Sequence, residues 1–180
     1  MDKRYLDLFN VQEGQLREVL GIALQRGGDY ADLYFEYTVS NELSLRDGEV
    51  NAVSSNIDYG VGIRVVSGDK TGFAFTEQTT LAEMKHAARI AAQIATLSDS
   101  VTNIPAAFTP VKGTNYSPIL SPWEDHTVTE KMEWLTSLNE KVFAKDSRIT
   151  KVLERLTDSN TKILFYNSLG ESFTDERPMA

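Results

Sequence analysis

The residues whose types come closest to a chemical site lie between Asn56 and Glu77, in the stretch NIDYGVGIRVVSGDKTGFAFTE. A phosphate-binding loop of the form G-x-x-x-x-G-K-[ST] needs two glycines at fixed spacing, a lysine after the second one, and a following helix. Counted from Gly62, this spacing puts Ser67 where the second glycine is needed, and Gly68 is followed by an aspartate instead of lysine. The next residues alternate like a strand. The pattern argues against a nucleotide site, and we expect no cofactor-binding residue in this chain.

Metal binding is poorly supported by the sequence. Its two histidines, His86 and His126, do not form a helical His-x-x-x-His pair. Glu83 and His86 would share a helix face at i, i+3, as in di-metal carboxylate proteins. The simpler interpretation is a helix-capping glutamate beside a solvated histidine, with His126 in a loop. We favour it and expect no metal ligand.

The sequence also lacks the residue patterns typical of nucleophilic catalysis. There is no cysteine and no Gly-x-Ser-x-Gly elbow. The acidic pairs Glu124-Asp125 and Asp175-Glu176 are typical of solvated surface. Trp123 and Trp134 flank the start of a predicted helix, where packing is the expected role and a binding platform is the alternative. We therefore expect no catalytic residue.

Composition bounds the class of protein. Of 180 residues, 41% are hydrophobic and 24% are charged, which is typical of soluble globular chains. The formal net charge of −8 argues against direct contact with nucleic acid or anionic membrane, because phosphate contacts need clustered Lys and Arg. The lack of cysteine, and of any apolar run of signal-peptide or membrane-spanning length, favours the cytoplasm.

Three segments have helical periodicity, and each follows a residue that can cap a helix and a glutamate three positions later. These pairs are Asn10 with Glu13, Thr80 with Glu83, and Thr127 with Glu130. The first helix is expected to stop at Gly27-Gly28. The buried faces expected of the second and third helices are Leu81, Met84, Ala88, Ala91 and Ala95, flanked by Ala87 and Ile94, and then Val128, Met132, Leu135, Leu138 and Val142.

Between the first two helices the apolar period changes to two. Asp47-Gly48 lies between two short alternating runs, which predicts a β-hairpin, and a second hairpin is expected around residues 67–70. Residues 11–97 therefore predict the order α-β-β-β-β-β-α. This is an α+β fold with a mostly antiparallel sheet and flanking helices.

The predicted domain organisation has three parts: an N-terminal α+β domain at 1–97, a proline-rich connector at 98–126, and the start of a second domain at 127–180. Four of the five prolines fall in the connector. The last part offers a helix and three candidate strands. That is too little to cover both faces of a sheet, so we expect an incomplete second α/β unit that is cut short.

The run ADLYFEYTVSNELSLRDGEVNAVSSNIDYGVGIRVVSGDKTGFAFTE and the alanine-rich helix after it resemble the N-terminal region of the TldD/PmbA family, with the glycine-rich hairpin closer to the TldD branch. The later stretch KILFYNSLGESFTDERP is similar to the start of that family's central domain, where an N-S-x-G … D-x-R-P pattern recurs. The resemblance covers about residues 11–180.

The resemblance implies a zinc-dependent metallopeptidase that cleaves peptides or unfolded proteins and pairs with a PmbA/TldE-like subunit or with a second copy. In that family a His-Glu-x-x-x-His helix holds the zinc. No such motif occurs in this chain, so no catalytic or metal residue is carried over, and zinc is expected only in the full-length family protein. The family's older label, modulator of DNA gyrase, fits poorly with the acidic charge.

Three functional hypotheses follow. The favoured one is a scaffold, dimerisation and substrate-cleft region of a TldD-like peptidase, not catalytic by itself. The second is a stand-alone peptide- or protein-binding module that uses an exposed edge strand. A nucleotide enzyme ranks last. Under the first two hypotheses the glycines are backbone devices: Gly68 takes a positive-φ turn position, while Gly60, Gly62 and Gly72 allow a bulge or the close approach of another backbone.

Overall fold

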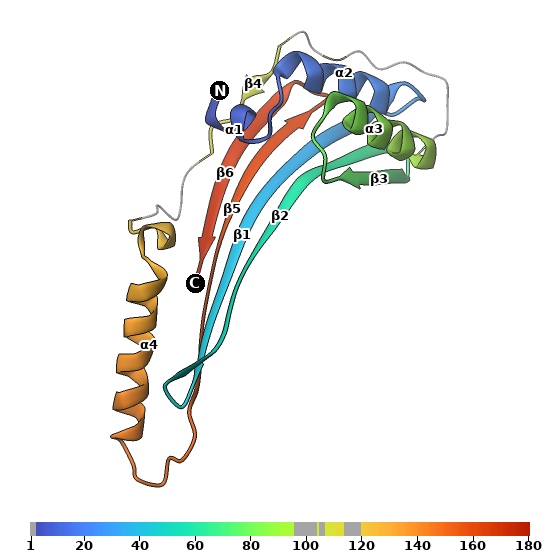
Figure 1. The fold of residues 1–180 in the computed structure, drawn as a ribbon. Helices are drawn as coiled ribbons and strands as arrows, with labels where there is room; N and C mark the ends of the chain where they lie inside the picture. Colours follow the sequence, from blue (N-terminus) through green and yellow to red (C-terminus); the bar gives the residue numbers. More distant parts are fainter. Residues whose placement is uncertain (1–2, 96–103, 105–106, 114–119) are drawn as a thin grey trace. The chain divides into compact units, whose positions relative to one another are not determined.

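The computed structural model describes residues 3–95, 104, 107–113 and 120–180 (Figure 1). Its elements are α1 (Lys3–Leu8), α2 (Glu13–Leu24), β1 (Tyr30–Arg46), β2 (Glu49–Ser67), β3 (Lys70–Thr76), α3 (Leu81–Ala95), β4 (Thr109–Pro110), the 3-10 turn η1 (Trp123–Asp125), α4 (Val128–Phe143), β5 (Leu153–Asn167) and β6 (Glu171–Met179).

The strands form one six-stranded sheet in the order β3-β2-β1-β5-β6-β4. β2 and β3 pair antiparallel, whereas the two-residue strand β4 pairs parallel with β6. The expected α+β class with a mostly antiparallel sheet is confirmed. One detail was wrong: β5 and β6 do not form a second, incomplete sheet but continue the first sheet beside β1.

The predicted number of strands was also wrong. Five strands were expected before α3 and the structure has three, because β1 runs unbroken through Ser40-Asn41 and β2 through Ser54–Asp58. Likewise, three candidate strands were expected in residues 127–180 and the structure has two, β5 and β6. At Ser40-Asn41 the strand continues because a neighbouring strand satisfies the polar side chain: Asn41 Nδ2 donates to Asp158 Oδ1 at 2.9 Å.

Two compact units share the long strands. Unit 1 comprises Met1–Tyr37, Tyr59–Thr114 and Lys162–Glu176, and unit 2 comprises Thr38–Asp58, Asn115–Thr161 and Arg177–Ala180. Each unit takes segments from both sides of residues 98–126, so the three-part domain division stays a prediction about the sequence. The connector lies partly outside the described residues; its described parts include β4 and η1.

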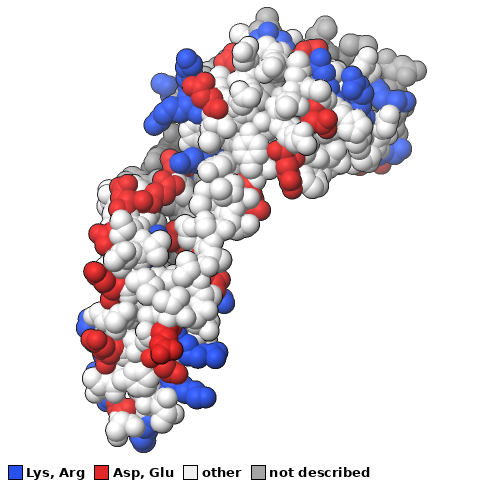
Figure 2. Space-filling view, viewed as in Figure 1, with Lys and Arg blue, Asp and Glu red and all other residues white. Residues whose placement is uncertain are grey.

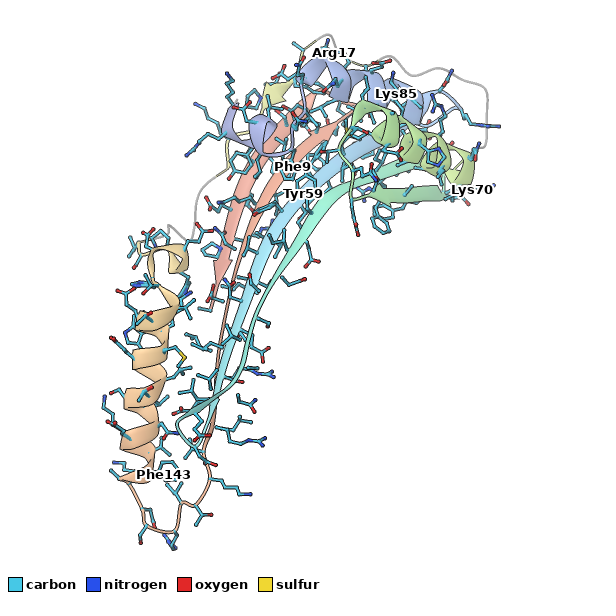
Figure 3. The ribbon with its side chains drawn as sticks, viewed as in Figure 1. Phe9, Arg17, Tyr59, Lys70, Lys85 and Phe143 are labelled. Carbon is cyan, nitrogen blue, oxygen red and sulfur yellow. The ribbon has the colours of Figure 1, made fainter. Side chains whose placement is uncertain are left out.

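In unit 1, α2 and α3 pack on each other, and α3 packs on β3, so that both helices cover one face of the sheet (Figure 1). The buried face of α3 is formed by small side chains around one methionine, namely Met84, Ala87, Ala88, Ala91, Ala92 and Ala95. Ile94, expected beside this face, is 55% exposed. Phe9 and Tyr59 stack with ring centroids 5.6 Å apart (Figure 3).

The helix starts test the three capping pairs. At α4 the pair is confirmed, because Thr127 accepts from Glu130 N and the Glu130 side chain accepts from Thr127 N. At α3, Thr80 Oγ1 accepts from Glu83 N at 3.4 Å. At α2 the prediction was wrong: Asn10 has a φ of 52°, and the helix begins two residues later on a capping box of Gln12 with Gln15.

The turns follow local sequence. Asp47 and Gly48 both have positive φ, as the predicted two-residue hairpin requires. The N-S-L-G run forms the β5–β6 turn, where Asn167 Oδ1 accepts from the backbone N–H groups of Leu169 and Glu171. Ser168 Oγ accepts from Ala31 N at 3.0 Å and so ties this turn to the start of β1.

In unit 2, α4 covers β1 and β5 through Leu135, which clusters with Leu43 and Leu45. The predicted apolar face of α4 was wrong at two of its five positions, since Val128 and Leu138 are 58% and 48% exposed. The residues buried on α4 are Lys131, Leu135 and Asn139, which recur every four positions along one face.

Candidate functional site

In unit 1, the glycine-rich hairpin forms a tight turn and packs closely against a helix. Gly68, with a φ of 57°, and Asp69 form the β2–β3 turn, and Lys70 begins β3 in an exposed position (Figure 3). A Cβ at Gly72 would overlap the carbonyl oxygen of Ala91, so this glycine lets α3 lie directly on β3. Because Gly72 faces the last turns of α3, the helix end nearest this hairpin carries the partial negative charge of a C-terminus, which disfavours phosphate.

The candidate metal residues do not come together. Glu83 and His86 are both exposed on α3 in unit 1, whereas His126 belongs to unit 2. Among the described residues there is no group of three or more His, Cys, Asp or Glu side chains that would hold a metal ion. We assign no metal ligand.

A second polar cluster in unit 1 is an ion pair on the sheet. Arg64 Nε and Nη2 donate to Asp32 Oδ2 at 2.9 and 2.5 Å, and the guanidinium lies 5.8 Å from the centre of the Tyr30 ring. Burial raises the pKa of the Tyr30 phenol, and the neighbouring Asp32 carboxylate raises it further. The hydrogen bonds that Arg64 donates to the Asp32 carboxylate raise the pKa of Arg64. Because Arg64 and Asp32 satisfy each other, we interpret the pair as structural.

Unit 2 holds the arrangement best suited to a ligand. Its interior contains a buried ion pair, in which Lys131 Nζ on α4 donates to Asp158 Oδ2 on β5 at 2.8 Å. Asp158 also accepts from Asn41 on β1 at 2.9 Å. The aspartate is thus fixed by two partners from two different elements.

Three aromatic rings gather at the start of α4. His126 lies 6.0 Å from Trp123 and 5.0 Å from Trp134, centre to centre, and the two indoles are 6.1 Å apart. Ser121 Oγ lies 3.2 Å from His126 Nε2. Lys131 Nζ lies 5.8 Å from the centre of the Trp123 ring, within cation–π range. The packing role expected for both tryptophans is present, and the cluster also forms a wall.

Two of these rings, Trp123 and His126, line the smaller of two adjoining hollows. The smaller, of about 290 Å³, is lined by Asn41, Glu42, Leu43, Val53, Ser54, Ser55, Trp123, Glu124, His126, Val128, Lys131, Leu156 and Asp158. The larger, of about 520 Å³, shares four of these residues, namely Asn41, Glu42, Ser54 and Asp158. We call the two together the unit 2 hollow.

The hollow lies beside a free strand edge. β3 pairs with β2 only at Val61–Ser67, so in the part of the chain that the structure describes no strand pairs with the outer side of β2 at Glu49–Asp58. Nine of these ten residues are exposed, including Val50, Val53 and Ile57. Such an edge offers unpaired backbone groups to another chain.

Sequence patterns pointed to three of these five residues and missed two. Trp123, His126 and Trp134 stand out in the sequence and the structure brings them together. Lys131 and Asp158 gave no signal, because a lysine on a helix and an aspartate at a strand end are usually solvated. Their pairing depends on where β5 and α4 meet.

No helix among the described residues is long and apolar enough to cross a membrane. Two protein-family models match the chain: PmbA/TldA metallopeptidase domain 1 at residues 31–95 and the PmbA/TldA metallopeptidase central domain at residues 121–180.

Relatives with curated descriptions agree. A metalloprotease TldD homolog of Haemophilus influenzae is 34% identical over 170 residues, which cover 94% of this chain and 35% of that protein. A metalloprotease TldD homolog of Buchnera aphidicola is 30% identical over 151 residues, 84% of this chain and 31% of that protein. The chain thus spans about a third of the length of these relatives.

Solved structures share the fold. A Thermotoga maritima protein described as a modulator of a DNA gyrase matches 92% of this chain and 37% of its own, with a TM-score of 0.69 and 21% identity. TldE from Thermococcus kodakarensis matches 91% of this chain and 37% of its own, with a TM-score of 0.65 and 16% identity.

Proposed function

Because the chain belongs to the PmbA/TldD metallopeptidase family, we propose that it is the N-terminal scaffold and peptide-binding region of a TldD-like zinc metallopeptidase. The observation that carries the proposal is the unit 2 hollow beside the free edge of β2 at Glu49–Asp58. An extended peptide would add to this edge through main-chain hydrogen bonds and place alternate side chains over the hollow.

We propose that the zinc site of the full-length protein lies outside the third of the relatives' length that this chain matches. The described residues do not fit a zinc site, because they contain no cluster of three or more ligating side chains. Structural and catalytic zinc sites both need at least three protein ligands. We therefore derive no catalytic step from this chain.

A second subunit is part of the proposal. One structure with this fold is TldE of Thermococcus kodakarensis. We propose that this chain's protein pairs with a PmbA/TldE-like subunit or with a second copy. Size-exclusion chromatography with light scattering, with and without such a subunit, tests this: a protein that stays monomeric in both cases contradicts it.

Binding and hydrolysis of an unfolded protein test the main proposal. Fluorescein-labelled casein is titrated with the 180-residue chain, and anisotropy and fragment release are followed with and without zinc chloride. We expect binding and no fragments. Fragment release by this chain alone would overturn the division of labour, and no binding would overturn the peptide-binding role.

The free edge of β2 favours a second candidate equally, a peptide-binding module with no enzymatic role. The two differ in the gene. A reading frame that continues past Ala180 and encodes His-Glu-x-x-x-His supports the peptidase, whereas a stop codon there supports the module.

A further inference from the structure

The edge strand β3 in unit 1 carries two exposed phenylalanines. Phe73 and Phe75 are 57% and 70% exposed, whereas Gly72, next to them on the strand, is buried against α3. Because side chains alternate along a strand, both rings lie on the face of the sheet that α3 does not cover. Phe75 is opposite Gly62 on β2, and a Cβ at Gly62 would lie 2.9 Å from Cε2 of the Phe73 ring. Both rings thus adjoin a residue that has no side chain to cover them.

The flank of α3 above this edge is apolar as well. Ile90 and Ile94 are 38% and 55% exposed. Lys85 of α3 forms an ion pair with Glu18 of α2, and Ile94 follows Lys85 by nine residues, which is about two and a half turns of helix. The two isoleucines therefore lie on the side of α3 that faces away from α2. Since α3 packs on β3, the last strand of the sheet, this side overhangs the sheet edge (Figure 1).

The outer side of β3 lacks the features that usually protect an edge strand. Among the described residues no strand pairs with this side, because β3 is the last strand and pairs with β2 alone. Between Lys70 and Glu77 the sequence has neither proline nor a charged residue. Figure 2 shows mostly uncharged surface at the place of β3. Charges and prolines are what keep exposed edges from pairing with other chains, so this edge is open to another strand.

The sequence of β3 is complementary to a second copy of itself. In an antiparallel pair with a two-fold axis at Ala74, Phe73 of each copy lies opposite Phe75 of the other. The axis is perpendicular to the sheet, so all four rings lie on one face and form one cluster. Aromatic pairs across neighbouring strands stabilise strand pairing. A two-fold axis at Phe73 would instead place Phe75 opposite Thr71, so the axis at Ala74 buries more aromatic surface.

The apolar area of this edge is that of a modest interface. If a buried aromatic side chain contributes about 200 Å², the exposed parts of Phe73 and Phe75 offer about 250 Å² per copy. Ile90, Ile94 and the strand backbone add to this area, toward the about 800 Å² per partner of a standard interface. Interfaces at or below this size form weak dimers whose population depends on concentration.

We propose that β3 is a homodimerisation edge, at which two copies of this chain pair antiparallel through Phe73 and Phe75. Ile90 and Ile94 of the two α3 helices meet above the paired strands, and the sheet continues from one copy into the other. Because both copies use the same surface, the assembly closes at two. This inference rests on the proposed pairing with a second copy and names its surface. The proposed peptide-binding edge, on β2 in unit 2, stays open.

Matched variants test the surface. Size-exclusion chromatography with light scattering measures the mass of the intact chain over about 1–100 μM, and we expect a dimer with a Kd of about 10 μM. Phe73→Thr/Phe75→Thr should raise this Kd at least about ten-fold, because it removes the aromatic cluster. Val53→Thr/Ile57→Thr removes two side chains of similar exposure from the β2 edge in unit 2 and should leave the Kd unchanged. Circular dichroism checks that both variants fold.

Engineered cysteines test the register, since the chain has none of its own. With the two-fold axis at Ala74, Thr71 lies opposite Glu77 of the other copy, with Cα atoms about 4.5–5.5 Å apart, a span that a disulfide bridges. Thr71→Cys/Glu77→Cys should therefore form a covalent dimer when oxidised with copper phenanthroline. Each single variant should stay monomeric on a non-reducing gel, because its two cysteines would lie about 20 Å apart.

The outcomes separate this inference from the proposed function. A chain that is monomeric at every concentration, or a dimer that survives Phe73→Thr/Phe75→Thr, overturns the β3 edge. Cross-linking in either single cysteine variant overturns the register. A chain that is monomeric alone but binds a PmbA/TldE-like subunit overturns the homodimer and leaves the proposed pairing intact. Casein binding is read separately: its loss in the unaltered chain removes the peptide-binding role and leaves the β3 dimer standing.

Discussion

Replacing Gly72 with alanine tests the packing of α3 on β3. The new Cβ would overlap the Ala91 carbonyl oxygen, and it would lie 2.9 Å from the Ala91 carbonyl carbon and 3.0 Å from Ala95 N. Comfortable contacts between such atoms lie at about 3.5–4.0 Å. All three neighbours are helix backbone, so no side-chain rotation relieves the overlap, and α3 has to move away by about 1 Å.

A shift of this size is costly for a thin, alanine-rich interface. A gap of about 0.5–1 Å forfeits a quarter to a half of each dispersion contact, and overpacked cores lose about 1–3 kcal/mol. We expect Gly72→Ala to lower the free energy of unfolding by about 3 kcal/mol, the upper end of this range. With a urea m-value of about 2 kcal/mol/M, the unfolding midpoint, followed by far-ultraviolet circular dichroism, should fall by about 1.5 M.

Gly14→Ala is the matched control. Gly14 is exposed in the first turn of α2, and a Cβ there meets nothing within 4 Å. The free energy of unfolding of the Gly14→Ala variant should rise by up to about 1 kcal/mol, because alanine favours a helix more than glycine does. Adding Ala91→Gly to Gly72→Ala should not rescue it, since the overlap is with backbone atoms. Equal midpoints for Gly72→Ala and Gly14→Ala would refute this account of the hairpin.

Three further outcomes are expected. Lys131→Met should destabilise unit 2 by about 3–5 kcal/mol, because it leaves the Asp158 carboxylate buried without its cation. Adding Asp158→Asn should recover part of this loss, and urea unfolding followed by tryptophan fluorescence measures both variants. Hydrogen bonds from Thr127 lower the pKa of Glu130. The stability that this carboxylate contributes is therefore present above its unfolded pKa of about 4.3 and is lost as pH falls below it. Glu130→Gln should flatten the acid side of a plot of melting temperature against pH. Burial, reinforced by Glu13, raises the pKa of Tyr166, so stability should decline as pH rises above about 10, and Tyr166→Phe should reduce that decline, to which Tyr30 also contributes.

Short-range signals in the sequence predicted the turns well. Asp47-Gly48 and Gly68 determine their backbone locally through positive φ, and Thr127 with Glu130 closes a capping box within four residues. The Asn10 cap was wrong because an equally local alternative, Gln12 with Gln15, starts the helix instead. Gln is a weaker expected cap than Asn, so propensity alone gave the other answer.

Strand lengths and the buried face of α4 depend on distant partners. β1 continues through Ser40-Asn41 because β5 supplies partners more than 100 residues away, such as Thr161, whose hydroxyl lies 2.8 Å from that of Thr38. Lys131 is buried because Asp158 neutralises it. Both effects depend on partners that lie outside any window of ten or fifteen residues. Sequence patterns therefore predicted shorter strands and a purely apolar helix face.

The unit 2 hollow exists because of one strand register. Asn41 lies in the region matched by the first family model, while Lys131 and Asp158 lie in the region matched by the second, and β5 joins the two regions by lying between β1 and β6. Side chains alternate along β5, so a slip of one residue against β1 would turn Asp158 to the opposite face and away from both Lys131 and Asn41. The hydrogen bonds between Thr38 and Thr161, and between Ala31 and Ser168, hold that register at two separate points. The polar residues that appeared to interrupt the strands are therefore the ones that align them, and the same alignment places the charged groups of the proposed peptide site.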